Sequence, residues 1–354
     1  MKKVEEYVLC QLTSGVDSFW GLCERSPFPL SEIIRTIDSL KRNGYISING
    51  AGIKPNKKGI KAIDCGSGVR AGEICHCCDG KGVVVGEKFQ KIIADFREIV
   101  KDRPVPSLKF FQGYMREEDV IVRAALMHRH GDLRSREIVL MGDDDLLSVA
   151  LSLTKMPARI CVLDADERLE EFLKAVNREH GFEIEFIKYN VEDPLPKKMI
   201  GAFDVFSSEP LESISGLKAF VVRGVSCLKE NGVGYFGLTT LEASRSKWLQ
   251  IEKLLGKMNC VITDIIRDFS RYPMKYDAVD YEIFAKELPF PVGPNPGIDW
   301  YRSTLFRFEV VSRPRPCISP YQRFRIKSVD EEEDLTHPMG FKTIRKLSQP
   351  ERGT

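Results

Sequence analysis

The sequence predicts an α/β protein built on a doubly wound parallel sheet, with a small winged-helix-like unit in front of it. Three observations lead to this prediction. The chain has 354 residues, which is too long for one ordinary core. From about residue 118, short apolar runs alternate with amphipathic helical patterns, as expected for a parallel sheet covered by helices. Residues 1–62 instead show helical spacing followed by a short hairpin pattern.

The first predicted unit, residues 1–62, begins with helices and ends in a hairpin. A helix spans 31–41, and Asn43-Gly44 stops it. Strands at 45–48 and 53–59 then form the wing, whose basic residues would suit DNA. Because 53 Lys and Arg nearly balance 51 Asp and Glu, nucleic-acid binding is not expected, and a dimerisation or lid module is favoured. The basic wing residues are Lys54, Lys57 and Lys58.

Residues 63–117 are predicted to be a Cys- and Gly-rich linker followed by a helix at 86–100. The N-terminus has no apolar run after its lysines, so we expect a cytoplasmic protein without a membrane span and without structural disulfides. In the linker, Cys75 and Cys78 form a Cys-x-x-Cys knuckle, which is typical of a structural zinc or iron site. Cys65 and Cys77 could complete the ligand set, a second subunit could share the metal, or the linker could be metal-free. Adjacent Cys77 and Cys78 are not expected to bind one ion without strain.

The central unit, residues 118–312, contains the predicted sheet. In a doubly wound sheet the ligand lies beyond the carboxyl ends of the strands, so the residues after each strand indicate the function. Residues 313–354 form a tail that is expected to be partly mobile, with an acidic stretch at 330–334 that closes over the site or is simply solvated. The predicted strands are 137–141, 159–163, 184–189, 203–206, 233–238, 261–269, 278–285 and 305–311, and the predicted helices are 145–153, 167–180, 213–229 and 241–258.

Three carboxylates follow the first predicted strand of this unit. Gly142 allows the backbone to approach a ligand, and Asp143, Asp144 and Asp145 then stand where a phosphate would otherwise bind. One aspartate could simply cap the next helix. Three adjacent carboxylates repel one another unless a cation neutralises them. The pattern therefore disfavours a dinucleotide and indicates a positively charged ligand.

The ends of the later strands indicate a nucleoside and an amine. Asp164 follows the second strand, where a carboxylate accepts both ribose hydroxyls, and Asn190 and Val191 follow the third, where residues commonly flank an adenine. Glu209 follows the fourth strand and could hold an amine or accept its proton, although Ser, Pro and Glu also suit a helix start. The predicted pocket therefore accepts a neutral nucleoside at one end and a multiply charged cation at the other.

Four stretches carrying these residues resemble the branched-chain polyamine synthases of archaea and thermophiles, the N(4)-bis(aminopropyl)spermidine synthases. The resemblance implies a Rossmann-like domain of the class I methyltransferase type. It also implies transfer of aminopropyl groups from decarboxylated S-adenosylmethionine to spermidine or a related polyamine, with 5′-methylthioadenosine as product, and a homodimer is expected. The family usually has Asp-Pro-Pro-Glu where this chain has Glu209-Pro210-Leu211-Glu212. The four stretches are Gly142–Ser148, Phe203–Ser213, Gly234–Leu238 and Thr263–Phe269.

The resemblance also implies a role for each candidate residue. Asp143 to Asp145 would hold the aminopropyl ammonium and the acceptor amines, with Gly142 and Asp145 also against the cofactor. Asp164 would bind the ribose, and Asn190 with Val191 would lie at the adenine. Two glutamates, Glu209 and Glu212, would face the acceptor. Two other functions stay open: an S-adenosylmethionine-dependent methyltransferase, and a winged-helix regulator that senses a nucleoside.

Overall fold

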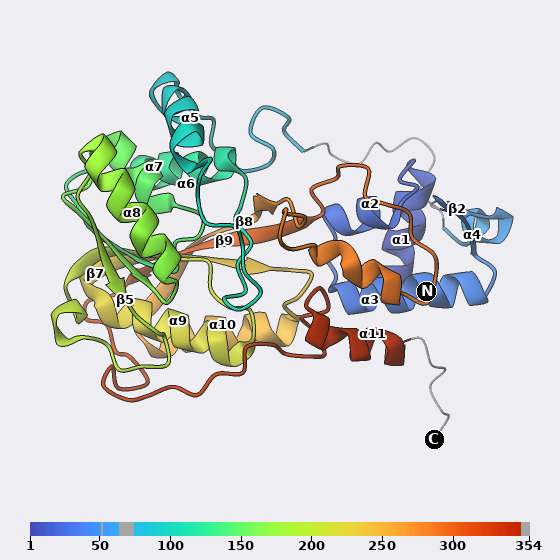
Figure 1. Cartoon of the computed structure of the whole chain (residues 1–354). Helices are drawn as coiled ribbons and strands as arrows, with labels where there is room; N and C mark the ends of the chain where they lie inside the picture. The colour runs from blue at the N-terminus through green and yellow to red at the C-terminus, as the bar shows by residue number, and fades with distance from the viewer. Residues whose placement is uncertain (51, 64–73, 348–354) are drawn as a thin grey trace.

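A computed structural model describes residues 1–50, 52–63 and 74–347. Its main feature is a seven-stranded sheet in the order β5-β4-β3-β6-β7-β9-β8 (Figure 1). Strands β3 to β7 pair parallel with one another, as predicted. Strand β9 instead runs antiparallel to both β7 and β8. The strands are β3 (Glu137–Met141), β4 (Arg159–Asp164), β5 (Ile184–Lys188), β6 (Phe203–Ser208), β7 (Leu228–Thr239), β8 (Cys260–Tyr272) and β9 (Tyr301–Val310).

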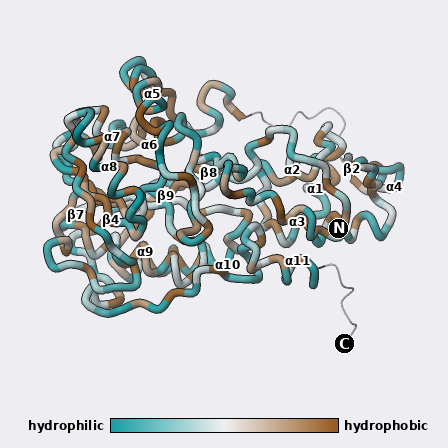
Figure 2. Tube along the Cα trace, in the orientation of Figure 1, coloured by the Kyte–Doolittle hydropathy of each residue, from teal (hydrophilic) through white to brown (hydrophobic). Residues whose placement is uncertain are grey.

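Helices cover both faces of this sheet, so the doubly wound prediction is confirmed. Alternate residues of β3 show it: Ile138 and Leu140 belong to one buried cluster, and Val139 and Met141 to the other. Figure 2 shows the hydrophobic positions along the strands, with hydrophilic ones along the outer loops. The first cluster contains α6 (Glu117–Arg129), α7 (Leu147–Thr154) and α8 (Glu167–His180), and the second contains α9 (Ile214–Cys227) and α10 (Arg245–Lys257).

One predicted strand was wrong. Residues 278–285 contain a 3-10 helix, η2 (Tyr281–Glu287), instead of a strand. Asp280 starts it by accepting a hydrogen bond from the Glu282 N–H at 2.9 Å, and the buried Tyr281 and Phe284 are three residues apart, which is the 3-10 period. The spacing of these two apolar residues had been interpreted as part of a strand. The chain between β8 and β9 therefore forms no further strand of the main sheet.

The N-terminal unit has three helices and a two-stranded hairpin, followed by a short helix. Asn56 ends the hairpin earlier than predicted because its side chain accepts hydrogen bonds from the N–H groups of Lys58 and Gly59 and so caps α4. The order of elements is compatible with a winged-helix-like unit, which stays a prediction. The elements are α1 (Lys3–Thr13), α2 (Phe19–Glu24), α3 (Leu30–Arg42), β1 (Ile46–Asn49), β2 (Gly52–Pro55) and α4 (Lys57–Ala62).

This N-terminal unit packs against the β8–β9 end of the sheet (Figure 1). Trp20 of α2 lies among Phe284 and Trp300, with ring centroids 6.0 and 5.2 Å away, and its indole N–H donates to the Gly293 carbonyl at 2.9 Å. Such aromatic packing fixes the two units relative to each other. The remaining helices are α5 (Glu87–Val100), η1 (Lys197–Met199), η3 (Pro338–Gly340) and α11 (Phe341–Leu347), which lies beside α3.

The C-terminal segment crosses the same side of the sheet as α9 and α10. Its acidic stretch is packed around a buried lysine in the structure: the Lys247 ammonium lies 3.2 Å from Asp330 and from Glu333, and 3.7 Å from Asp334. This placement disagrees with the solvated alternative for Asp330, Glu333 and Asp334, whereas Glu331 and Glu332 are exposed. Closure on ligand binding stays a prediction. In the part of the chain that the structure describes, no helix has the length and apolarity needed to cross a membrane.

Candidate active site

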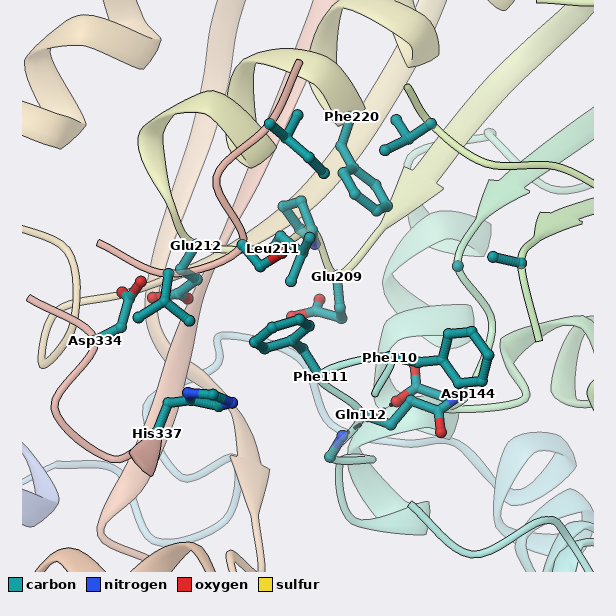
Figure 3. A pocket seen from close by; sticks show the side chains of 18 of the residues that line it. Phe110, Phe111, Gln112, Asp144, Glu209, Leu211, Glu212, Phe220, Asp334 and His337 are labelled. Carbon is teal, nitrogen blue, oxygen red and sulfur yellow. Dashed lines mark hydrogen bonds between the residues drawn. The ribbon is translucent and has the colours of Figure 1, made fainter. Parts of the chain in front are cut away.

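A cavity of about 470 Å³ lies beyond the carboxyl ends of β3 to β7 (Figure 3). Seven acidic residues line it, whereas the basic residues that line it, within the described chain, are Lys109 and His337. An anionic wall of this kind attracts cations and repels anions. The acidic residues are Asp144, Asp164, Glu192, Glu209, Glu212, Glu242 and Asp334.

The cavity brings together most of the residues predicted from the strand ends. These residues come from the ends of four neighbouring strands, β3 to β6, so the parallel sheet is what assembles them. Two predicted residues, Asp143 and Asp145, do not line the cavity. Those that do are Gly142, Asp144, Asp164, Asn190, Val191, Glu209 and Glu212.

The three adjacent aspartates point in different directions, which corrects the expected common role. The buried Asp143 accepts hydrogen bonds from the N–H of Ser148 at 3.1 Å and from its hydroxyl, so it holds the first turn of α7. Asp145 is also buried and accepts from the Met115 N–H at 2.6 Å. Asp144 alone of the three reaches the cavity. The left-handed backbone at Gly142 and Leu146 sets this turn, which no helical or strand period describes.

Asp144 has the electrostatic environment of a proton acceptor. One of its oxygens accepts from the Gly113 N–H at 3.2 Å, and no ion pair to it is found among the described residues. Burial and then the nearby Asp164 raise the pKa of Asp144 to about 7. A carboxyl with a pKa near neutrality exchanges protons readily at neutral pH.

Asp164 stands at the end of β4, on the side of the cavity formed by β4 and β5. Its carboxylate accepts from the Asp143 N–H at 3.0 Å and from the Asp166 N–H at 2.8 Å, which fixes its orientation. The exposed Asn190 and the buried Val191 follow β5 on the same side. Burial raises the pKa of Asp164. This side combines an oriented carboxylate with an apolar wall, as a ribose and a base require.

Glu209 is held from three directions at the middle of the cavity (Figure 3). It forms an ion pair with Arg123 of α6, and it accepts from the Tyr272 hydroxyl at 2.5 Å and from the Ser303 hydroxyl at 3.4 Å. A β-carbon at Gly237 would stand 1.9 Å from its Oε2, so only glycine leaves room for this side chain. The carboxylate therefore has one defined position.

The residues that position Glu209 were not among those predicted from the sequence. Arg123 had a signal, because it interrupts the apolar helical stretch 120–127 and is buried despite its charge. Tyr272 had no such signal in the sequence, because β8 reaches the site only through its pairing with β9, in which Tyr272 lies opposite Tyr301.

The far end of the cavity is a cluster of carboxyl groups. Burial raises the pKa of Glu212 to about 8, although Thr239 donates its N–H at 2.7 Å. Glu242 accepts from the Tyr301 hydroxyl and the Thr336 N–H, both at 2.7 Å. Burial and then Glu242 raise the pKa of Asp334 to about 7, and its buried Oδ1 has no hydrogen-bond donor in the described chain. Carboxyl groups crowded in this way favour the binding of a cation.

Two irregular segments close this cavity, and only the acidic stretch 330–334 of the second was considered for the site from the sequence. Residues 109–113 lie along one side, and the C-terminal segment contributes Asp334, Thr336 and His337. The rings of Phe111 and His337 meet with centroids 4.9 Å apart (Figure 3). Both segments are irregular, so no periodic pattern could have placed them here.

A separate cluster of thiols lies outside the cavity. The sulfur atoms of Cys75, Cys77 and Cys78 are all within 4.8 Å of one another, and those of Cys75 and Cys77 are 3.0 Å apart. The adjacent Cys77 and Cys78 both belong to the cluster, and whether they share an ion stays a prediction. Cys65, the other expected ligand, is outside the described residues. Hydrogen bonding from Cys77 lowers the pKa of Cys75 to about 7, so its thiolate forms near neutral pH.

Comparisons with known proteins find related sequences and a similar overall structure. The model of the branched-chain polyamine synthase A C-terminal domain matches residues 91–334. The chain is 38% identical over 318 residues to the N(4)-bis(aminopropyl)spermidine synthase of Methanocaldococcus jannaschii, covering 89% of each chain. It is 37% identical to the enzyme of that name from Thermococcus kodakarensis, covering 86% of this chain and 87% of the other. The crystal structure of the Thermus thermophilus branched-chain polyamine synthase, in complex with N4-aminopropylspermidine and 5′-methylthioadenosine, is similar with a TM-score of 0.81, 29% identity and coverage of 93% and 92%.

Proposed function

The chain belongs to the branched-chain polyamine synthase family, and on this basis we propose that it transfers aminopropyl groups from decarboxylated S-adenosylmethionine to spermidine or a related polyamine. 5′-Methylthioadenosine is the second product. One observation carries the proposal: a single cavity joins an oriented carboxylate beside an apolar wall to a cluster of carboxyl groups. The first part suits a nucleoside, and the second suits the ammonium groups of a polyamine.

The proposed arrangement places the donor along β4 and β5 and the acceptor beyond β6 and β7. Asp164 would hold the ribose hydroxyls, with Asn190 and Val191 at the adenine. The sulfonium and its aminopropyl group would then lie between Asp144 and Glu209. Glu212, Glu242 and Asp334, at the far end, would hold the distal ammonium groups of the acceptor.

The reaction would be an in-line displacement at the carbon attached to sulfur. The acceptor nitrogen forms the new C–N bond as the C–S bond breaks, and the bonding electrons remain on sulfur, which becomes the neutral thioether of methylthioadenosine. The amine must arrive unprotonated, although a free amine titrates near pH 10. We assign proton acceptance to Asp144, whose pKa lies near 7. Glu209, held by Arg123 and Tyr272, would orient the amine for attack.

The direct test incubates the protein with decarboxylated S-adenosylmethionine and spermidine, followed by chromatography of polyamines and nucleosides. We expect new polyamines heavier by one and two aminopropyl groups, with one methylthioadenosine released for each transfer. A parallel incubation with S-adenosylmethionine tests the methyltransferase alternative. A methylated polyamine there, with no product from the decarboxylated donor, would contradict the proposal.

The cavity wall also predicts donor selectivity. S-Adenosylmethionine carries a carboxylate where the decarboxylated donor has a hydrogen, and that group would lie near Asp144 and Glu209. Because like charges placed together cost several kcal/mol, we expect the decarboxylated donor to bind at least about tenfold more tightly. Isothermal titration calorimetry with each compound measures the difference. Equal dissociation constants would contradict this placement.

We further infer that Cys75, Cys77 and Cys78 hold one structural zinc or iron ion. Their sulfurs lie close enough to share an ion, since a zinc–sulfur bond is about 2.3 Å. Elemental analysis of protein purified without chelator should find about one ion per chain, and Cys75→Ser should remove it. Cys317→Ser, at an exposed thiol elsewhere, is the matched control. Less than about half an ion per chain would argue against the site.

A further inference from the structure

We propose that Asp119 is a positioning residue for the transfer reaction, because it fixes α6 against β8 so that Arg123 and Tyr272 meet at Glu209. Asp119 does not line the cavity, and its side chain is completely buried. The inference rests on the proposed function, in which Glu209 orients the acceptor amine.

The two main holders of Glu209 come from elements that are far apart in the sequence. Arg123 lies on α6 and its side chain is 2% exposed. Tyr272 is the last residue of β8 and donates to Glu209 at 2.5 Å. The position of the carboxylate therefore depends on how α6 and β8 sit relative to each other.

Asp119 connects these two elements directly. It lies one helical turn before Arg123 on α6, and its carboxylate binds Arg271, the residue immediately before Tyr272. Arg271 donates its backbone N–H and its Nε at 2.9 Å to one oxygen of Asp119, and its Nη2 at 3.0 Å to the other. In return, the Arg271 carbonyl accepts the N–H of Arg116, at the start of α6, at 2.9 Å. A two-pronged pair of this kind fixes orientation as well as distance.

A second cation completes the charge balance around Asp119. The Lys81 ammonium pairs with the same carboxylate, and the side chain of Lys81 is 4% exposed. Removing the Asp119 charge would take away the nearest anion of Lys81 and Arg271 in a largely buried position, which is destabilising. Asp79, 4.0 Å from Arg271, would remain as a weaker partner. The three-residue network thus joins the segment after the thiol cluster to α6 and β8.

The first test compares Asp119→Asn with Glu118→Gln by steady-state kinetics and by methylthioadenosine titration. We expect Asp119→Asn to lower kcat about 100-fold, because a small displacement of Glu209 misplaces the acceptor, while methylthioadenosine affinity changes less than about twofold. Glu118 is the neighbouring residue on α6, and its partly exposed ion pair with Arg97 should contribute little, so Glu118→Gln should keep the unaltered kcat. An unaltered kcat in Asp119→Asn, or an equal loss of nucleoside affinity, would overturn the proposal.

A second set of variants separates positioning from stability. The double variant Lys81→Met, Asp119→Leu removes a buried anion together with one of its cations, so its melting temperature should recover relative to Asp119→Asn. Its kcat should stay low, because Arg271 has lost its acceptor. Recovery of kcat together with stability would mean that the role is only structural.

If Asp119→Asn does not fold, Arg271→Lys keeps the positive charge but loses the two-pronged contact. We expect a reduced kcat at a nearly unaltered melting temperature, and an unaltered kcat would overturn the proposal. The unaltered protein is assayed first. Absence of aminopropyl transfer there would overturn the proposed function and this inference with it, whereas active unaltered protein with fully active variants overturns the inference alone.

Discussion

Glu209→Gln should lower kcat by about 100- to 1,000-fold while the dissociation constant of methylthioadenosine changes less than about twofold. The substitution removes the negative charge that faces the acceptor amine, and charge-assisted hydrogen bonds are about twice as strong as neutral ones. It leaves Arg123, which is 2% exposed, without its anion, so stability should also fall by about 3 kcal/mol. Rapid-quench turnover, calorimetric titration of methylthioadenosine and thermal unfolding measure the three quantities.

Two further variants show whether this effect belongs to Glu209. Glu230→Gln removes a carboxylate that is 54% exposed and outside the cavity, and should leave kcat unaltered. Glu209→Asp keeps the charge but shortens the side chain by one methylene, so it should retain more activity than the glutamine variant. If Glu209→Gln turned over at the unaltered rate, Glu209 would serve only to pair with the buried Arg123, because Ser213 and not Glu209 caps α9.

Asp144→Asn should lower kcat about 100-fold above pH 7 and remove the acidic limb of the pH profile. Burial, then the neighbouring Asp164 and, more weakly, Glu209 raise the pKa of Asp144 to about 7. The carboxyl is therefore protonated below pH 7 and cannot accept a proton there. In the unaltered protein kcat should rise about tenfold per pH unit up to about pH 7 and then level off.

The profile should be measured at saturating spermidine from about pH 5 to 9, with Glu230→Gln as the control variant. The acceptor amine titrates near pH 10, so its own ionisation does not produce a limb near 7. Asp334 also has a pKa near 7 and lines the cavity, so it is the alternative source of such a limb. Persistence of the limb in Asp144→Asn would assign it to another group and contradict the role of Asp144.

Local sequence patterns predicted the part of the fold that depends on the order of strands and helices along the chain. Most of the apolar runs that became β3 to β7 alternate with helices, and a parallel sheet follows from that alternation, although β5 and β6 are joined through η1 alone. The reversed direction of β9 depends on the path of residues 273–300, which contain η2 and irregular chain. Its position between β7 and β8 is a long-range pairing, and no local period encodes it.

The residues of the site also divide into those that local sequence patterns predict and those that long-range contacts place. Asp164, Asn190 and Glu209 could be predicted because strand ends converge at one edge of the sheet. Asp143 and Asp145 turned away because left-handed residues on either side of the trio decide where each side chain points. Glu242 carried no motif, since it follows β7 by a few residues. Asp334 belongs to the acidic stretch 330–334, but the sequence could not tell which of its carboxylates reaches the cavity.

The position of Lys81 ties the N-terminal part of the chain to the sheet more closely than the sequence suggests. The family match begins at residue 91, so a fragment starting there would contain the whole sheet and every carboxyl group of the cavity. It would nevertheless lack the ammonium that neutralises Asp119 and the aromatic contacts that α2 makes with Phe284 and Trp300. Asp119 would then be paired with Arg271 alone. A shortened form of the enzyme should therefore keep Lys81 and α2 in the same chain as the sheet.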